Sequence, residues 1–347
     1  MLMEQKVTVI GAGASGLMAA ICAARQGAFA TVLEHRQEAG IKLALTGNGR
    51  CNYTNTGIGS PHYHAEDPNF VAQILQRFSY ADCIRFFREI GIEPLVRHYP
   101  YDDLGYVYPE GMDAAAFRDR LKSTAAALGV RLCLGMEDSE VLERCREILR
   151  KREEEPSRKL ILATGSNAFP ATGSDSSLYP LIRELGLSFR TFLPALCALH
   201  SKDPALQELA GRRIRGEAVL ELRQGPCVSR YSCSGEIQFT RHSISGIPVM
   251  QLSRHAAIAL REGKEVFLTA AGRRFAIHRT AGFDRAQSCS GGIALSEIDP
   301  DTMEMRRHPG VYACGELLDI DGECGGFHLH LAWATGFIAG NAAGRRN

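Results

Sequence analysis

The chain has 347 residues, of which 45% are hydrophobic and 23% are charged, and these values exclude a disordered or fibrous protein. At about 150 residues per domain, the length predicts two domains. The 40 lysines and arginines are balanced by 39 aspartates and glutamates, which gives a formal charge of +1. No overall electric field therefore draws the protein to nucleic acid or to an anionic membrane.

Eleven cysteines, an odd number, are scattered from Cys22 to Cys324 without a CxxC pair. This pattern fits neither a disulfide framework nor a zinc site, so we expect no bound metal and a reducing, cytoplasmic location. The uncharged stretch 7–24 is interrupted by three glycines, and no cleavage site follows it. We therefore expect no signal peptide and no membrane segment.

The first 34 residues predict a βαβ unit. Lys6–Ile10 alternates into β-branched residues and predicts a buried strand, which ends at a glycine cluster. The Ala-rich stretch Gly16–Gln26 predicts a helix, and Phe29–Glu34 predicts a second strand. The two strands must then be parallel, with a right-handed crossover.

The next 130 residues predict a mixture of loops and helices. Ile41–Thr56 is rich in Gly and Asn and predicts a loop, whereas the apolar spacing in Phe70–Gly91 and Met112–Gly129 predicts helices. The highly charged stretch Glu143–Lys159 predicts a solvated hairpin that leads into a strand at Leu160–Ala163.

From about residue 188 the pattern changes to short alternating runs separated by Gly, Pro and Ser, with strands expected at Ala218–Leu222, Glu236–Thr240 and Val266–Thr269. An α/β pattern returns after Gly282 and ends in a Gly- and Ala-rich helix over 326–343. The predicted fold is therefore α/β: a discontinuous Rossmann-like domain, residues 1–187 and 279–347, with an inserted mostly-β domain at 188–278.

The motif Gly11-Ala-Gly-Ala-Ser-Gly16 between the first strand and helix predicts a dinucleotide site. Gly11 permits a tight turn, Gly13 lets the backbone approach a pyrophosphate, and Gly16 lets the helix pack on the strand. Glu34 can accept hydrogen bonds from ribose hydroxyls, and its charge disfavours a 2′-phosphate, so FAD or NAD is expected rather than NADP. The predicted site comprises Gly11, Gly13, Ala14, Ser15, Gly16, Glu34 and His35.

Two later strand ends favour FAD over NAD. Thr164 and Gly165 follow the apolar strand at 160–163, and Gly315 and Glu316 follow another at 310–314. Together with the glycine motif, these segments resemble the FAD-binding pattern of two-dinucleotide-fold flavoproteins. No second GxGxxG motif follows in the middle of the chain, so no separate nicotinamide domain is expected. Electrons would then come from a transiently docked donor or leave to oxygen.

A narrower resemblance begins at residues 40–55, GIKLALTGNGRCNYTN, which are similar to the G-x-K-L-x-x-S/T-G-x-G-R-C-N-x-T-N loop of the BaiN/RdsA-type NAD(P)/FAD-dependent oxidoreductases. This group is also known as the aminoacetone oxidase family of FAD-binding enzymes. Segments 235–246, 281–292 and 315–326 match the family as well. The resemblance implies tightly but non-covalently bound FAD, hydride transfer at flavin N5, and NADH or NADPH as a transient donor.

The residues of this loop suit a cofactor site on physical grounds. Lys42 and Arg50 supply cationic donors, and Asn52 and Asn55 can hold the loop by local hydrogen bonds. Cys51 is either a redox thiol or, more commonly for a lone cysteine, a small packing residue. The loop residues assigned to the cofactor site are Lys42, Gly49, Arg50, Cys51 and Asn52.

Gly325 and Gly326 open the last predicted helix, whose N-terminus should face the flavin pyrimidine ring, with Phe327 beside it. The resemblance implies Tyr-Asn-x-Gln after this pair, but Phe-His-Leu-His stands here. His328 is the candidate catalytic residue, either as a donor to the reduced flavin or as a general acid. The alternative is a structural histidine at a helix start.

The resemblance also leaves the substrate open. Relatives carry a helical subdomain after the β domain, whereas 266–277 crosses directly here, so we expect a more open site. One reading is oxidoreduction of a small molecule, either reduction of a C=C or imine bond or oxidation of an amine by oxygen. The alternative is reduction of uridine in ribosomal RNA. Arginines at 212, 213, 215, 223, 230 and 241 would suit RNA, although such clusters are more often solvated faces.

Overall fold

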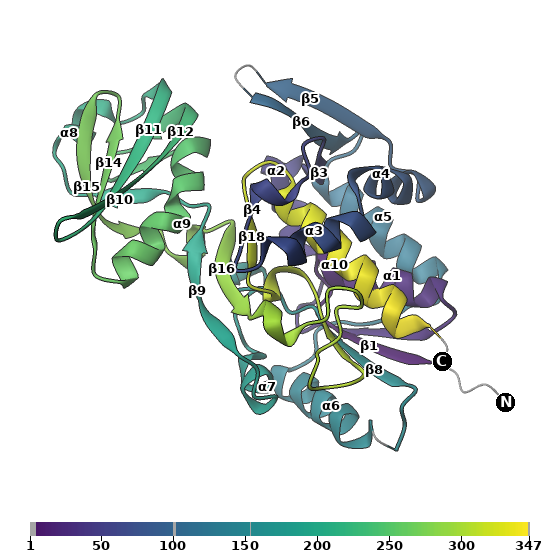
Figure 1. The fold of residues 1–347 in the computed structure, drawn as a ribbon. Coiled ribbons are helices and arrows are strands. Elements are labelled where there is room, and N and C mark those ends of the chain that lie inside the picture. Colours follow the sequence, from purple (N-terminus) through teal and green to yellow (C-terminus); the bar gives the residue numbers. More distant parts are fainter. Residues whose placement is uncertain (1–4, 100–101, 153, 346–347) are drawn as a thin grey trace. The chain divides into compact units, whose positions relative to one another are not determined.

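The computed structural model describes residues 5–99, 102–152 and 154–345 (Figure 1). They form two compact units. The sheet domain comprises Met1–Ser166, Thr172–Arg190 and Gly291–Asn347, and the barrel domain comprises Asn167–Ala171 and Thr191–Ser290. The barrel domain extends past residue 278 because the chain returns to its own entry segment. The amides of Ala281 and Gln287 donate to the carbonyls of Ala198 and Leu196.

A five-stranded parallel sheet forms the centre of the sheet domain. Its β-branched and apolar strands are buried, as expected for a sheet covered on both faces. The strands expected at 6–10, 29–34 and 160–163 are confirmed, and the domain is of the Rossmann type. In spatial order the strands are β17 (Val311–Ala313), β8 (Arg158–Leu162), β1 (Lys6–Ile10), β2 (Phe29–Leu33) and β7 (Arg131–Cys133).

Helices α1 (Ala14–Arg25) and α10 (Phe327–Gly344) pack directly against each other (Figure 1). Glycines spaced four residues apart on α10 allow this close approach. A Cβ atom at Gly340 would lie 2.2 Å from the Ala19 carbonyl oxygen, and one at Gly336 would lie 2.5 Å from that of Ser15. The Gly- and Ala-rich composition of the last helix therefore serves backbone contact with α1, which places the starts of both helices near the sheet edge.

The segment between β2 and β8 differs from the sequence expectation in two places. The expected loop at 41–56 contains α2 (Ile41–Gly49), which is kinked at Thr46–Asn48, and the short strand β3 (Thr54–Asn55). The expected hairpin at 143–159 is instead α6 (Asp138–Lys151). Its apolar residues Val141, Cys145 and Ile148 are buried, and its charges form ion pairs along the exposed face.

The expected helical regions at 70–91 and 112–129 are confirmed, the first as two helices. A capping box at Ser79 and Asp82 starts the second of these. The remaining elements of the sheet domain are η1 (Ser60–His62), β4 (Tyr63–Ala65), α3 (Pro68–Arg77), α4 (Tyr80–Glu89), β5 (Pro94–Tyr99), β6 (Asp102–Pro109), α5 (Ala114–Ala127), α7 (Tyr179–Glu184), η4 (Leu295–Glu297), η5 (Gly315–Leu317) and β18 (Ile320–Gly322). The segments η2 (Pro170–Thr172), β9 (Phe189–Ala195) and β16 (Ser288–Ile293) lie where the chain passes between the two units.

The barrel domain is a closed six-stranded antiparallel barrel with its own apolar core, which includes Leu220, Phe239, Leu268 and Phe275. The three strands expected from alternation are confirmed. A tight β14–β15 hairpin stands where relatives were expected to carry a helical subdomain. The elements are β10 (Leu199–Ser201), α8 (Ala205–Leu209), β11 (Arg213–Gln224), β12 (Cys227–Phe239), β13 (Ser243–Ser245), α9 (Ile247–Arg261), β14 (Glu265–Ala270), β15 (Arg273–Thr280) and η3 (Phe283–Arg285). Among the described residues of the chain, no helix is both long and apolar enough to span a membrane.

Candidate functional site

Four predicted site segments meet at one edge of the parallel sheet, because the carboxyl ends of all its strands lie at that edge. The glycine turn follows β1, Glu34 follows β2, Thr164 and Gly165 follow β8, and Gly315 follows β17. In doubly wound α/β folds, ligands bind outside the carboxyl ends of the strands. The fold therefore brings together four segments that are up to 300 residues apart in the sequence.

The glycines of the first turn have different surroundings. A Cβ atom at Gly11 would lie 2.5 Å from the Ala163 carbonyl oxygen, and one at Gly16 would lie 1.9 Å from that of Gly11. A Cβ atom at Gly13 would meet no atom within 4 Å. Gly11 and Gly16 are thus required for packing, whereas Gly13 caps α1 at an open position where a phosphate could approach the helix N-terminus.

The carboxylate of Glu34 holds this turn in place. The backbone N–H of Ala12 donates to Glu34 Oε2 at 2.7 Å, and that of Arg36 donates to Oε1 at 2.9 Å. His35 is anchored next to it, with its Nδ1 2.8 Å from Asp138 Oδ1. Glu34 therefore shapes the nucleotide turn as well as lying where a ribose was expected.

Lys42 and Glu316, predicted separately as cofactor ligands, form an ion pair with 2.7 Å between Lys42 Nζ and Glu316 Oε2. The hydroxyl of Ser166 also donates to Glu316, at 3.1 Å. Burial acts to raise the pKa of the Glu316 carboxyl, but Lys42, His328 and the hydrogen bonds outweigh burial and hold it below its ordinary value of 4.5. The pair therefore forms a charged, partly buried anchor between α2 and the end of β17.

The chain is strongly curved from the C-terminal end of α2 to Cys51, since Gly47, Asn48, Gly49 and Cys51 all have positive φ. The Arg50 side chain is exposed, with its guanidinium 5.4 Å from the centre of the Tyr108 ring. Cys51 is fully buried, and burial raises the pKa of its thiol to about 12. A thiolate is therefore absent at neutral pH, which favours the packing interpretation of Cys51.

Asn55 makes a long-range contact as well as the expected local one. Asn55 Nδ2 donates to the carbonyl of Gly325 at 2.9 Å, and its Oδ1 accepts from the amide of Gly57. A Cβ atom at Gly326 would lie 2.6 Å from the Thr54 carbonyl oxygen and 2.9 Å from Asn52 Oδ1. The loop and the start of α10 are thus locked together, and only glycine fits at 326.

His328 lies in the first turn of α10, beside the Lys42–Glu316 pair. Its Nε2 contacts Gly322, at 2.8 Å from the carbonyl oxygen and 3.1 Å from the amide nitrogen. Its Nδ1 is 3.8 Å from Glu316 Oε1 and is buried without a hydrogen-bond partner among the residues that the structure describes. Burial lowers the pKa of His328 despite the nearby carboxylate, so the ring is neutral at pH 7.

Comparison with known proteins decides the family. A model of the HI0933-like protein Rossmann domain matches residues 5–342. The chain belongs to the HI0933-like family. The 3-dehydro-bile acid delta(4,6)-reductase of Clostridium scindens is 33% identical, over 98% of this chain and 99% of that protein. The alignment spans 415 positions, so the relative carries internal residues that the 347-residue chain lacks.

A second HI0933-like relative, the ribosomal RNA dihydrouridine synthase of Haemophilus influenzae, is 26% identical over 97% of this chain and 98% of that protein. Among solved structures, 3-ketosteroid-delta4-(5alpha)-dehydrogenase from Rhodococcus jostii shares the fold, with a TM-score of 0.53 and 15% identity over 99% of this chain and 97% of that chain. The predictions of the family, the fold class and an FAD-dependent oxidoreductase are confirmed.

The residues of this HI0933-like site fit FAD. The open position at Gly13 can take a pyrophosphate, and Glu34 offers a ribose acceptor. The buried Nδ1 of His328 and Oδ1 of Asn52 have no hydrogen-bond partner in the described part of the chain. No group of three or more His, Cys, Asp or Glu side chains in the described part of the chain is arranged to hold a metal ion. The donors and acceptors therefore suit an organic dinucleotide.

Some residues of this site were missed from the sequence. Ser166 binds Glu316, and the only signal for it was its place directly after Thr164 and Gly165 at a strand end. His62 stacks on Phe327 with ring centres 4.7 Å apart, and Tyr63 OH donates to the Phe327 carbonyl at 3.0 Å. No sequence pattern marked these two residues, because their partner lies about 260 positions away.

Proposed function

We propose that this protein reduces a C=C bond conjugated to a carbonyl in a small organic substrate, with NADH or NADPH as the electron donor. The observation that carries the proposal is the combination of an FAD-type site with 33% identity to a protein named 3-dehydro-bile acid delta(4,6)-reductase. A hydride reaches one carbon of the double bond and a proton the other, while the nicotinamide is oxidised.

Bound FAD supplies the chemistry of accepting and passing on a hydride at flavin N5. The chain's own residues hold it. The amide groups at the start of α1 would bind the pyrophosphate, and Glu34 the adenosine ribose. The start of α10 at Gly326 would stabilise negative charge at the flavin pyrimidine ring. Lys42 and Glu316 would fix the position of the end of β17 relative to α2.

Two alternatives use the same site. One is oxidation of an amine by oxygen, which would need no nicotinamide. The other is reduction of uridine in ribosomal RNA, which is favoured by the 26% identity to a protein named ribosomal RNA dihydrouridine synthase. Neither alternative changes the residues proposed to hold FAD. The three reactions are therefore distinguished by which electron donor reduces the flavin and which substrate reoxidises it.

The experiment uses the purified yellow holoenzyme without oxygen. We expect NADH or NADPH to bleach the flavin absorbance near 450 nm, and a 4-en-3-one or 4,6-dien-3-one steroid to restore it. If aminoacetone bleaches the flavin and neither NADH nor NADPH does, the result would favour the amine oxidase over the reductase. If the purified protein turns over no steroid and a deletion strain loses dihydrouridine from its ribosomal RNA, the result would favour reduction of uridine in ribosomal RNA.

A separate prediction concerns His328, which is neutral in the resting protein and which we propose to take up a proton at Nδ1, the nitrogen nearest Glu316, and to pass it to the substrate. His328→Gln can keep the contact with Gly322 but cannot act as an acid. We expect substrate reduction to slow about 100-fold, a typical contribution of general acid catalysis, while flavin reduction by the nicotinamide stays within about twofold. Stopped-flow absorbance measures the two half-reactions separately. Unchanged rates in both would assign His328 a structural role.

A further inference from the structure

The positive charge of the chain is concentrated in the barrel domain. Residues 191–290 contain 14 lysines and arginines against 8 aspartates and glutamates, a formal charge of +6, and Asn167–Ala171 adds no charge. The whole chain carries +1, so the sheet domain carries −5. This asymmetry is hidden in the overall composition, and it points to an anionic ligand for the barrel domain.

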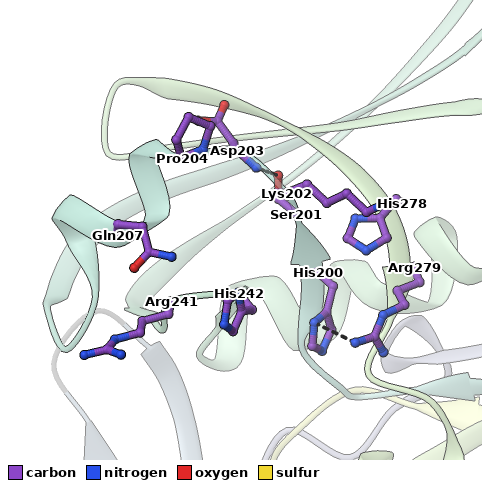
Figure 2. A pocket seen from close by; sticks show the side chains of 10 residues that line it. All are labelled: His200, Ser201, Lys202, Asp203, Pro204, Gln207, Arg241, His242, His278 and Arg279. Atoms are coloured by element: carbon purple, nitrogen blue, oxygen red, sulfur yellow. Dashed lines mark hydrogen bonds between the residues drawn. The ribbon is translucent and has the colours of Figure 1, made fainter.

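A pocket of about 440 Å³ lies in the barrel domain (Figure 2). Such a volume is within the usual range for small-molecule sites. Its lining holds three permanent cations, three histidines and a single carboxylate, and comes from three separate segments. The lining residues are His200, Ser201, Lys202, Asp203, Pro204, Gln207, Arg241, His242, His278 and Arg279.

The barrel strands explain why these side chains gather outside the core. Along β10, Leu199 and Ser201 are buried, so the intervening His200 points outward. His200 lies opposite Arg279 of β15, but Ser201 lies opposite Ile277, so His278 is the extra residue of a β-bulge. The bulge lets His278 and Arg279 both stay exposed in succession. Bulges are common next to functional sites, where they redirect side chains.

The cations of this pocket have no acidic partners among the described residues. Elsewhere in the barrel, Arg223, Arg230 and Arg274 all donate to Glu221. In contrast, no ion pair within the described part of the chain involves the pocket's Lys202, Arg241 or Arg279. Arg279 instead donates to His200 Nδ1 at 3.2 Å (Figure 2), and Asp203 accepts from the amide of Ala205. These three cations of the pocket are therefore available to bind an anionic ligand.

We propose that this pocket binds the phosphate or pyrophosphate group of a small, dissociable ligand such as a nucleotide. Arginine and lysine together with histidine N–H groups are suited to phosphate oxygens. All three cations line this one pocket, which favours a compact anion over an extended RNA backbone. The proposal is independent of the flavin chemistry, because it concerns binding to the barrel domain alone.

Protonation should strengthen this binding. Burial and the neighbouring Arg279, His278 and His242 lower the pKa of His200, and burial, Lys202 and Arg279 lower that of His278. The other charged groups of the pocket are Arg241 and Asp203. A bound dianion stabilises the imidazolium forms and raises both pKa values, so affinity should rise as the pH falls from 8 to 6. Sulfate tests this, since its own charge is constant over that range.

The experiment is calorimetric titration of the FAD-loaded protein with inorganic pyrophosphate and with sulfate. We expect saturable pyrophosphate binding that weakens at least tenfold in Arg279→Gln and in Lys202→Gln. Arg261→Gln is the matched control, because Arg261 is an exposed arginine of α9 outside the pocket. In the control we expect less than a twofold change, with flavin absorbance the same in all variants.

Three results would overturn the proposal. The first is the absence of saturable binding of both pyrophosphate and sulfate at millimolar concentration. The second is equal weakening in Arg261→Gln and Arg279→Gln, which would mean that only net charge matters. The third is binding of an RNA oligonucleotide that depends on Arg279 while pyrophosphate does not bind. Because none of these readouts uses catalysis, they do not depend on the outcome of the reductase experiment.

Discussion

Replacing Glu34 with alanine is expected to weaken FAD binding about 10- to 100-fold. The carboxylate accepts the backbone N–H groups of Ala12 and Arg36, so its loss releases the glycine turn and also removes the proposed acceptor for the ribose. Each hydrogen bond to a charged group is worth about 1.5–3 kcal/mol, which corresponds to roughly one to two powers of ten in affinity. Titration of the apoprotein with FAD, followed by flavin fluorescence, measures this change.

Glu38→Ala is the control for this experiment. Glu38 lies four residues later, and its half-exposed carboxylate pairs with the largely buried Arg118 and with Lys122. Such pairs contribute about 0–1 kcal/mol, so FAD affinity should stay within about twofold. The FAD affinity of Glu34→Gln should fall between those of Glu34→Ala and Glu38→Ala. The single amide oxygen of glutamine can replace only one of the two carboxylate oxygens that accept hydrogen bonds. Equal FAD affinity in Glu34→Ala and wild type would remove Glu34 from the cofactor site.

The parts of the fold that follow from local pattern could be predicted from the sequence. The βαβ unit has one buried strand on each side of an Ala-rich helix, and the glycine turn between them allows little else. The barrel strands alternate clearly between buried and exposed residues, as in β14 and β15. In these places propensity, periodicity and turn chemistry agree.

Helix α6 was mispredicted because its charges hid a regular apolar spacing. Val141, Cys145 and Ile148 recur at helical intervals of four and three residues, and these are the buried positions. The high charge of the stretch was correctly read as a wet surface, but a solvated face is compatible with a helix as well as with a hairpin. The helical spacing of the apolar residues, rather than the charge content, distinguishes a helix from a hairpin in this stretch.

The contacts that complete the site could not be predicted, because they join residues far apart in the sequence. Lys42 and Glu316 are 274 positions apart, and Asn55 and Gly325 are 270 apart. Sequence patterns identified both residues of the first pair as chemically important, but only the fold shows that they bind each other. The β-bulge at His278 has the same origin, since it depends on the register between β10 and β15.

The Lys42–Glu316 pair leads to the second large expected effect. Lys42→Met leaves the Glu316 carboxylate partly buried without its cation, so burial should raise the pKa of Glu316 above its ordinary value of 4.5. Breaking one partner of a fully buried pair costs about 3–5 kcal/mol. The two side chains here are 27% and 18% exposed, so solvent screening reduces the expected loss to roughly 1–2 kcal/mol. Thermal unfolding at pH 7 measures this loss.

The pH dependence of this loss has a definite sign. In the wild type the pKa of Glu316 is lowered, so the pair stabilises the fold above about pH 4.5 and this stabilisation disappears as the pH falls further. In Lys42→Met the raised pKa makes the folded state prefer a protonated Glu316, and stability is lost as the pH rises. The difference in unfolding free energy between the two proteins should therefore be largest at pH 7–8 and shrink towards pH 4.

A double-mutant cycle separates pairing from packing. Glu316→Gln removes the charge that Lys42 compensates, so Lys42→Met combined with Glu316→Gln should be more stable at pH 7 than Lys42→Met alone. Lys122→Met is the matched control, because Lys122 is 28% exposed and, among the described residues, pairs only with the exposed Asp119 and Glu38. Its loss should be below about 1 kcal/mol and independent of pH above 5. Additive effects across the cycle would show that the two side chains stabilise the site separately, and the end of β17 would then be held to α2 by packing alone.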